Sequence, residues 1–197
     1  TFLHLFFFLT LAGAILNTYM FNPTKDKYYA MILMNMDARE YTLSNYIYAI
    51  SKTFLGFLPF TLLFGFFVGL PIWLSSILPL LVCSAKITMA AINLRKYNKE
   101  KKVINENNPP KSYWIFMFVF LLCAYGIPFL NITINEPILC FLLIISIGIG
   151  LFSWLQIWKF SYYRKVYKEL LSNTNIFLIN GNNKQEIVRA SSLKNIE

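Results

Sequence analysis

The sequence contains few of the side chains on which hydrolytic or metal-dependent catalysis depends. Histidine occurs once in 197 residues, at His4, and only nine residues are acidic. A Ser–His pair or a zinc site built on histidine would therefore need residues from another chain. The apolar segments hold no cluster of acids or histidines that could face one another. We expect no catalytic residue, no metal ligand and no cofactor, and we keep a membrane-embedded enzyme as a less favoured alternative.

Two further motifs are missing or uninformative. The sequence has no glycine-rich Walker loop, so the chain does not bind ATP by that device. Its three cysteines, Cys83, Cys123 and Cys140, all lie within apolar runs, without a second cysteine at metal-ligand spacing. We interpret them as small buried hydrophobic side chains.

Charge is also scarce, whereas apolar residues are abundant and grouped. Only 14% of residues are charged and 57% are hydrophobic, against about 25% and about 45–50% in an ordinary soluble domain. The apolar residues form runs of membrane length. We therefore predict an all-α polytopic transmembrane domain over 1–171 and a cytoplasmic tail over 172–197. About five spans are expected, near 1–21, 54–69, 72–92, 113–130 and 138–158.

The start of the chain lacks the basic residues that precede a signal peptide. No lysine or arginine occurs before Lys25, and the chain does not begin with methionine. We interpret the first apolar run as a membrane span rather than a cleaved signal. The chain is expected to be a fragment of a longer protein.

The basic residues are distributed unevenly between the connections. With five spans, all 18 lysines and arginines fall in 22–53, in 93–112, in the tail, or at Lys86 near one end of the third span. The connections near 69–71 and 131–137 contain none. The positive-inside rule then places the basic loops and the tail in the cytoplasm, in a multi-pass protein of the cell membrane. Nucleic-acid binding is not needed to explain the net charge of +9.

Residues 37–53 lie between the first two spans and have a helical pattern of their own. Apolar side chains recur on one face, whereas polar ones occupy much of the rest, as in a helix that lies in the membrane interface. The plain interpretation is a lipid anchor. A docking surface for a soluble partner is the alternative, favoured by the acid–base–acid cluster Asp37, Arg39 and Glu40.

Two features inside the apolar runs also have two interpretations. Lys86 is a candidate intramembrane charge, which is functional by default, but we expect its long side chain to extend toward the cytoplasmic headgroups. Gly65 and Gly69 have the spacing that lets two helices approach closely, although this spacing arises often by chance in apolar segments. The loop 93–112 is expected to be solvated because of its charge and its Pro109–Pro110 pair.

One stretch carries a family resemblance. Residues 34–60, MNMDAREYTLSNYIYAISKTFLGFLPF, and the following 64–87, FGFFVGLPIWLSSILPLLVCSAKI, resemble the integral-membrane permease subunits of ATP-binding-cassette (ABC) exporters of low-GC Gram-positive bacteria. The resemblance covers about 21–171. It implies a permease component that works with a separate cytoplasmic ATPase subunit, into which a cytoplasmic helix of the permease docks. The candidate contact residues are Asp37, Arg39, Glu40, Thr42 and Asn45.

The length of the chain leaves its partners open. Five spans are few for a complete pathway, so a second permease copy or the missing part of the chain is expected beside it in the lipid bilayer. A small membrane accessory or immunity protein that binds another membrane protein fits the length equally well. The sequence does not identify a transported substrate.

Overall fold

The computed structural model describes residues 2–130 and 134–172, and within these ranges the chain forms helices and no strand. The predicted all-α class is therefore confirmed. The tail expected over 172–197 lies, from residue 173 onward, outside the described residues. The elements are α1 (Phe2–Leu16), α2 (Lys25–Tyr28), the π-helical turn η1 (Tyr29–Leu33), α3 (Ala38–Val68), α4 (Ile72–Glu100), α5 (Lys111–Phe129), α6 (Glu136–Lys159) and α7 (Tyr163–Ser172).

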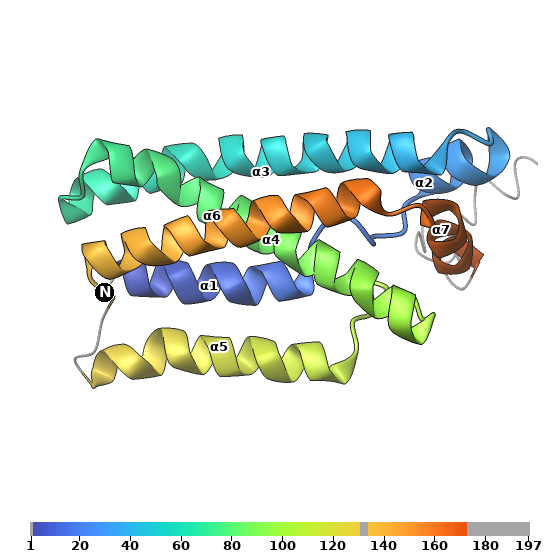
Figure 1. Cartoon of the computed structure of the whole chain (residues 1–197). Coiled ribbons are helices and arrows are strands. Elements are labelled where there is room, and N and C mark those ends of the chain that lie inside the picture. Colours follow the sequence, from blue (N-terminus) through green and yellow to red (C-terminus); the bar gives the residue numbers. More distant parts are fainter. Residues whose placement is uncertain (1, 131–133, 173–197) are drawn as a thin grey trace, which may run out of the picture.

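Five of these helices form an elongated up-and-down bundle. Figure 1 shows α1, α3, α4, α5 and α6 running along one common direction, with α7 lying across one end. The central helix is α4, which packs against α1, α3 and α6, whereas α5 packs mainly against α1. In the most apolar window of α4, 67% of residues are buried, against 11% in α3 and in α5. The outer helices therefore present most of their apolar side chains to the surroundings.

Four helices, α3, α4, α5 and α6, are long and apolar enough to cross a membrane. The chain is accordingly a multi-pass membrane protein by the length and composition of its helices. The first expected span corresponds to α1, whose 15 residues extend about 22 Å, less than the roughly 30 Å of hydrocarbon. It nevertheless runs beside α4 and α5 in the bundle.

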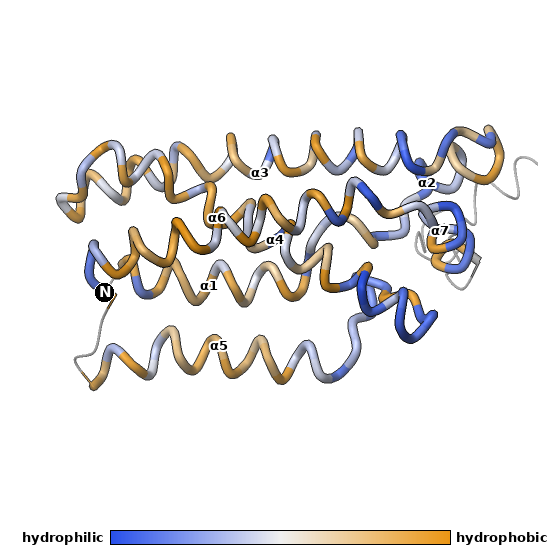
Figure 2. The backbone as a smooth tube through the Cα atoms, viewed as in Figure 1, coloured by the Kyte–Doolittle hydropathy of each residue, from blue (hydrophilic) through white to orange (hydrophobic). Residues whose placement is uncertain are grey.

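One end of the bundle collects most of the charge. We call it the basic end; it holds α2, η1, the connection 101–110 and α7. Figure 2 shows the hydrophilic colour concentrated there, around α2, α7 and the far end of α4. The turn between α3 and α4 lies at the opposite end. The connections that the sequence predicts to share one side of the membrane thus lie together in space.

The segment expected as an interfacial helix is the first half of α3, and it continues without a break into the next span. The helix begins at the N-cap Asp37 and ends at Gly69, whose φ of 78° closes the turn predicted at 69–71. Only Pro59 interrupts its hydrogen bonding, and the helix passes through it, as membrane helices commonly do. Its 31 residues extend about 46 Å, so roughly 16 Å remains beyond the hydrocarbon layer.

Helices near the basic end also differ from the prediction at their boundaries. Beyond the expected end near 92, α4 continues to Glu100, because Leu94 and Tyr97 pack into the core. Beyond α6 the chain forms a separate helix, α7. The buried Phe160 turns the chain between them with an extended backbone, φ −69° and ψ 130°. Tyr163, Val166, Tyr167 and Leu170 then form the buried face of α7.

Small residues allow close helix contacts away from the basic end. A Cβ added at Gly65 of α3 would lie 2.8 Å from the Cβ of Ser75 in α4, and one added at Gly150 of α6 would lie 2.8 Å from the Cβ of Ser84. Either distance is shorter than real contacts allow. Gly65 therefore serves the α3–α4 contact, whereas Gly69 serves the turn.

Candidate functional site at the basic end

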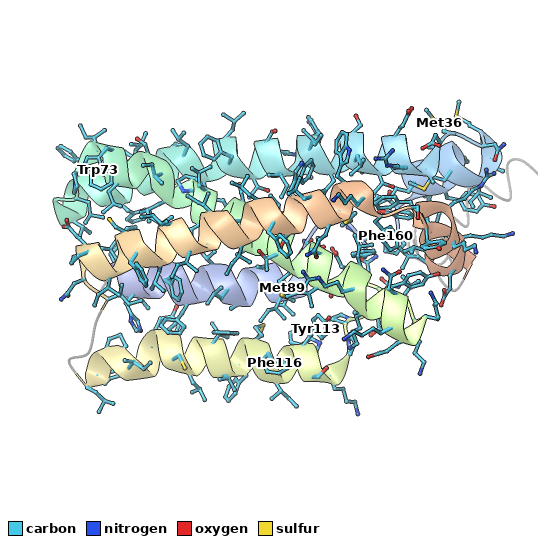
Figure 3. The ribbon with its side chains drawn as sticks, viewed as in Figure 1. Met36, Trp73, Met89, Tyr113, Phe116 and Phe160 are labelled. Atoms are coloured by element: carbon cyan, nitrogen blue, oxygen red, sulfur yellow. The ribbon has the colours of Figure 1, made fainter. Side chains whose placement is uncertain are left out.

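An exposed apolar patch occupies the outermost part of the basic end. We call it the tip, and it consists of Ile32, Leu33, Met34 and Met36, which are 39%, 59%, 71% and 46% exposed. Figure 3 shows Met36 at the outer end of α3, and Figure 2 shows apolar colour at the same place. The tip is apolar although the surrounding surface is charged.

Local hydrogen bonds fix the backbone of the tip. The amide of Met34 donates to the carbonyl of Tyr29 at 2.8 Å, and that of Met36 donates to Ala30 at 3.0 Å. Asn35 adopts the left-handed conformation with φ of 54°, and its side-chain oxygen accepts a hydrogen bond from Arg164 of α7. The patch is thus a defined turn held against α7.

The predicted contact residues Asp37, Arg39 and Glu40 begin α3 directly beside the tip. Asp37 Oδ1 accepts from the amides of Arg39 and Glu40 at 2.8 and 2.9 Å, which caps the helix. Arg39 Nη2 donates to the carbonyl of Trp158 at 2.9 Å, and its guanidinium lies 5.5 Å from the centre of that ring. Glu40 is exposed, and its carboxylate has no partner among residues 2–130 and 134–172.

The other two predicted contact residues lie elsewhere. Thr42 is only 2% exposed, and its hydroxyl donates to Ala38 at 2.6 Å. It cannot touch a partner without rearrangement of the helix. Asn45 is half-buried in a groove that Tyr41 and Tyr48 also line. The structure therefore brings only Asp37, Arg39 and Glu40 together with the tip.

A second polar site lies behind the tip, around the segment that follows α1. We call residues 17–22 the strap. Glu106, from the connection between α4 and α5, accepts hydrogen bonds from the Thr18 hydroxyl and from the amides of Tyr19 and Phe21, both at 3.0 Å. The expectation that this connection is solvated is therefore wrong at Glu106, which is half-buried.

Two lysines bind the carbonyl groups of the same strap. Lys86 donates to the carbonyl of Asn17 and lies 4.2 Å from the centre of the Tyr19 ring. The side chain extends toward the basic end, where this protein carbonyl holds its ammonium, and the residue is only 7% exposed. Lys27 donates to Met20 and Asn22 at 3.1 and 2.9 Å.

Burial governs the ionisation of Lys27. Desolvation lowers the pKa of its ammonium to about 8, and the negative charge of Glu106 partly opposes that shift. The hydroxyl of Tyr167 in α7 also donates to Met20, and burial raises its pKa above the usual range. Glu106, Lys27, Lys86, Tyr167 and the strap together form what we call the strap junction.

The sequence predicts the positions of only some of these groups. Tyr163, Val166, Tyr167 and Leu170 recur at helical spacing, which predicts one apolar face of α7. Nothing in the surrounding Asn- and Lys-rich stretch distinguishes Glu106 from a solvated acid. Its role depends on the strap, whose Thr18 is 88 positions away along the chain.

Residues 2–130 and 134–172 contain no group of three or more histidines, cysteines or acids able to hold a metal ion. His4 Nε2 forms a hydrogen bond with the carbonyl of Cys123 at 3.1 Å, which joins α1 to α5.

No protein-family model matches the chain, and no curated protein or solved structure matches it either.

Proposed function

We propose that the protein is the membrane-spanning permease component of an ABC-type exporter, and that the tip docks to a separate cytoplasmic ATPase subunit. The observation that carries the proposal is the exposed apolar tip next to Asp37, Arg39 and Glu40. Exposed apolar patches rimmed by charged groups mark interaction sites. Methionine is well suited to such a surface because its side chain adapts to its partner.

The position of the tip argues against lipid as its only contact. Counted back from Val68, about 20 residues of α3 span the roughly 30 Å of hydrocarbon and reach residue 49. Met36 lies 13 positions further toward the basic end, about 20 Å along a helix. By the positive-inside rule that end faces the cytoplasm, where a soluble subunit has access to it.

The continuity of α3 supports a coupling role. Asp37, Arg39 and Glu40 begin the same helix that forms the span, so a displacement of these residues moves the whole helix. Tyr46 stacks on Trp154 of α6 with ring centres 6.3 Å apart, and Arg39 binds the end of α6. Motion of α3 therefore also acts on α6. In the most apolar window of α3 only 11% of the residues are buried.

Copurification from native membranes tests the docking proposal. Met34→Glu combined with Met36→Glu places two charges on the tip, and we expect loss of a copurifying ATPase while membrane insertion is retained. Charge reversal at Glu40 should weaken the complex less. Tyr162→Glu is the matched control, because Tyr162 is 48% exposed at the same end but outside the tip. An ATPase that copurifies equally with all variants would refute the proposal.

The alternative, a small accessory or immunity protein, rests on a different surface. Phe66 and Phe67, in the half of α3 away from the basic end, are 77% and 79% exposed. Such exposed rings suit contact with another membrane protein as well as with lipid. Under this alternative an integral membrane protein copurifies instead of an ATPase. That complex should withstand the tip substitutions and be lost with substitutions at Phe66 and Phe67.

A further inference from the structure

A groove of about 640 Å³ runs along the side of α3 and changes character from one end to the other. One stripe of residues three or four positions apart lines it along α3: Tyr41, Asn45, Tyr48, Lys52, Gly56 and Phe60. Ala49, Thr53 and Phe57, on the neighbouring stripe, line it too. The other wall consists of Tyr19 and residues in 22–27. The groove is polar toward the basic end and apolar toward the middle of the membrane.

The change in polarity coincides with the expected edge of the hydrocarbon layer. Counted from Val68, about 20 helical residues place that edge near residue 49. Tyr48 and Lys52 flank this position, and Gly56 and Phe60 lie deeper. Lys52 lies about one turn inside this edge, but its long side chain can reach back to it. From Gly56 onward the groove is apolar, so its polarity matches one phospholipid molecule.

The charged groups in the groove favour an anion. Two cations, Lys27 and Lys52, and one acid, Asp26, line it, which leaves one net positive charge. Lys27 is occupied by the carbonyls of Met20 and Asn22. Lys52 is exposed, and no residue in the described part of the chain binds its ammonium. It is therefore the cation available to a ligand.

We propose that this groove binds one anionic phospholipid, with its phosphate at Lys52 and one acyl chain over Gly56 and Phe60. The tyrosine hydroxyls and the Asn45 amide offer hydrogen bonds to the hydroxyl groups of a headgroup such as glycerol. The lipid lies against both α3 and the strap residue Tyr19, so its binding links these two elements. This site does not depend on the presence of an ATPase partner.

The phosphate contact is tested with the purified full chain. The protein is incubated with equimolar phosphatidylglycerol and phosphatidylcholine in detergent, and retained lipid is measured by native mass spectrometry. We expect preferential retention of phosphatidylglycerol. Lys52→Gln should reduce that preference about fivefold, the effect of one lysine at a membrane surface. Lys159→Gln is the control, because Lys159 is an exposed cation at the basic end outside the groove.

The acyl-chain contact has its own matched pair of variants. A Cβ added at Gly56 meets no atom within 4 Å, and the same is true at Gly148 in α6. Gly56→Leu should fill the groove and lower retention of both lipids, whereas Gly148→Leu should leave retention unchanged. Thermal unfolding of each variant establishes that the fold is retained.

Several outcomes would overturn the site. Equal retention of both lipids by the unsubstituted chain would show that the groove does not select an anionic headgroup. The same loss in Lys52→Gln and Lys159→Gln shows attraction to the basic end as a whole, and unchanged retention in Gly56→Leu shows that no chain lies in the groove.

Discussion

The two ends of this helical bundle are held together in different ways. At the basic end, charged and hydrogen-bonding side chains from α2, α4, α7 and the 101–110 connection bind the irregular strap. Toward the opposite end, Leu74, Leu78, Leu139 and Leu143 pack together, and the Gly65–Ser75 contact brings α3 and α4 close. In lipid, helix association depends on close fit more than on the hydrophobic effect. Close fit should therefore determine stability in the membrane, and hydrogen bonds between charged side chains and the backbone should determine it at the basic end.

The largest effect is expected where shape matters most, at the α4–α6 contact. In Gly150→Leu the new Cβ would lie 2.8 Å from Ser84 Cβ and 3.1 Å from Ser84 Cα, and we expect a loss of about 3 kcal/mol of unfolding free energy. Thermal and denaturant unfolding in micelles, followed by tryptophan fluorescence, measures it. Gly148→Leu should change stability little, and an equal loss there would contradict the shape argument.

A smaller loss is expected from breaking the strap junction. Glu106→Ala leaves the Thr18 hydroxyl and the Phe21 amide without their acceptor, whereas the Tyr19 amide keeps Asn17 Oδ1 at 2.9 Å. The loss should cost about 2 kcal/mol. Glu106→Gln keeps one acceptor oxygen and should cost roughly half as much. Glu100→Ala serves as the control, since Glu100 is an exposed acid at the end of α4. If Glu106→Ala and Glu100→Ala unfold alike, the junction does not stabilise the fold.

The smallest effect is a pH dependence of the unfolding free energy, which should arise from the basic end alone. The pKa of Lys27 is about 8 in the folded chain, against 10.5 for a lysine that is fully solvated, as in the unfolded chain. Between these values the unfolded chain binds more protons, so stability rises as the pH increases. From pH 7 to 9 we expect a gain of about 1 kcal/mol. This rise should be absent in Lys27→Met, and a variant with the same rise would show that Lys27 is not its source.

The sequence predicts the parts of this fold that depend on local pattern. Apolar run lengths indicate the long spans, the Gly69–Leu70–Pro71 stretch indicates the turn between α3 and α4, and the basic residues indicate which connections share an end. The continuity of α3 is not predicted, because a polar stripe on a long helix resembles an interfacial helix. Glu106 and Tyr167 are not predicted as partners of the strap, because their roles arise only when distant segments meet.

The strap junction also sets an order on the assembly of the chain during synthesis. Tyr167 binds the carbonyl of Met20, 147 positions earlier. At about 5–20 residues per second, roughly 7–30 s pass between the synthesis of these two residues. During that interval water or other groups must satisfy the polar atoms of the strap. The strap junction is therefore completed only after α6 has been made.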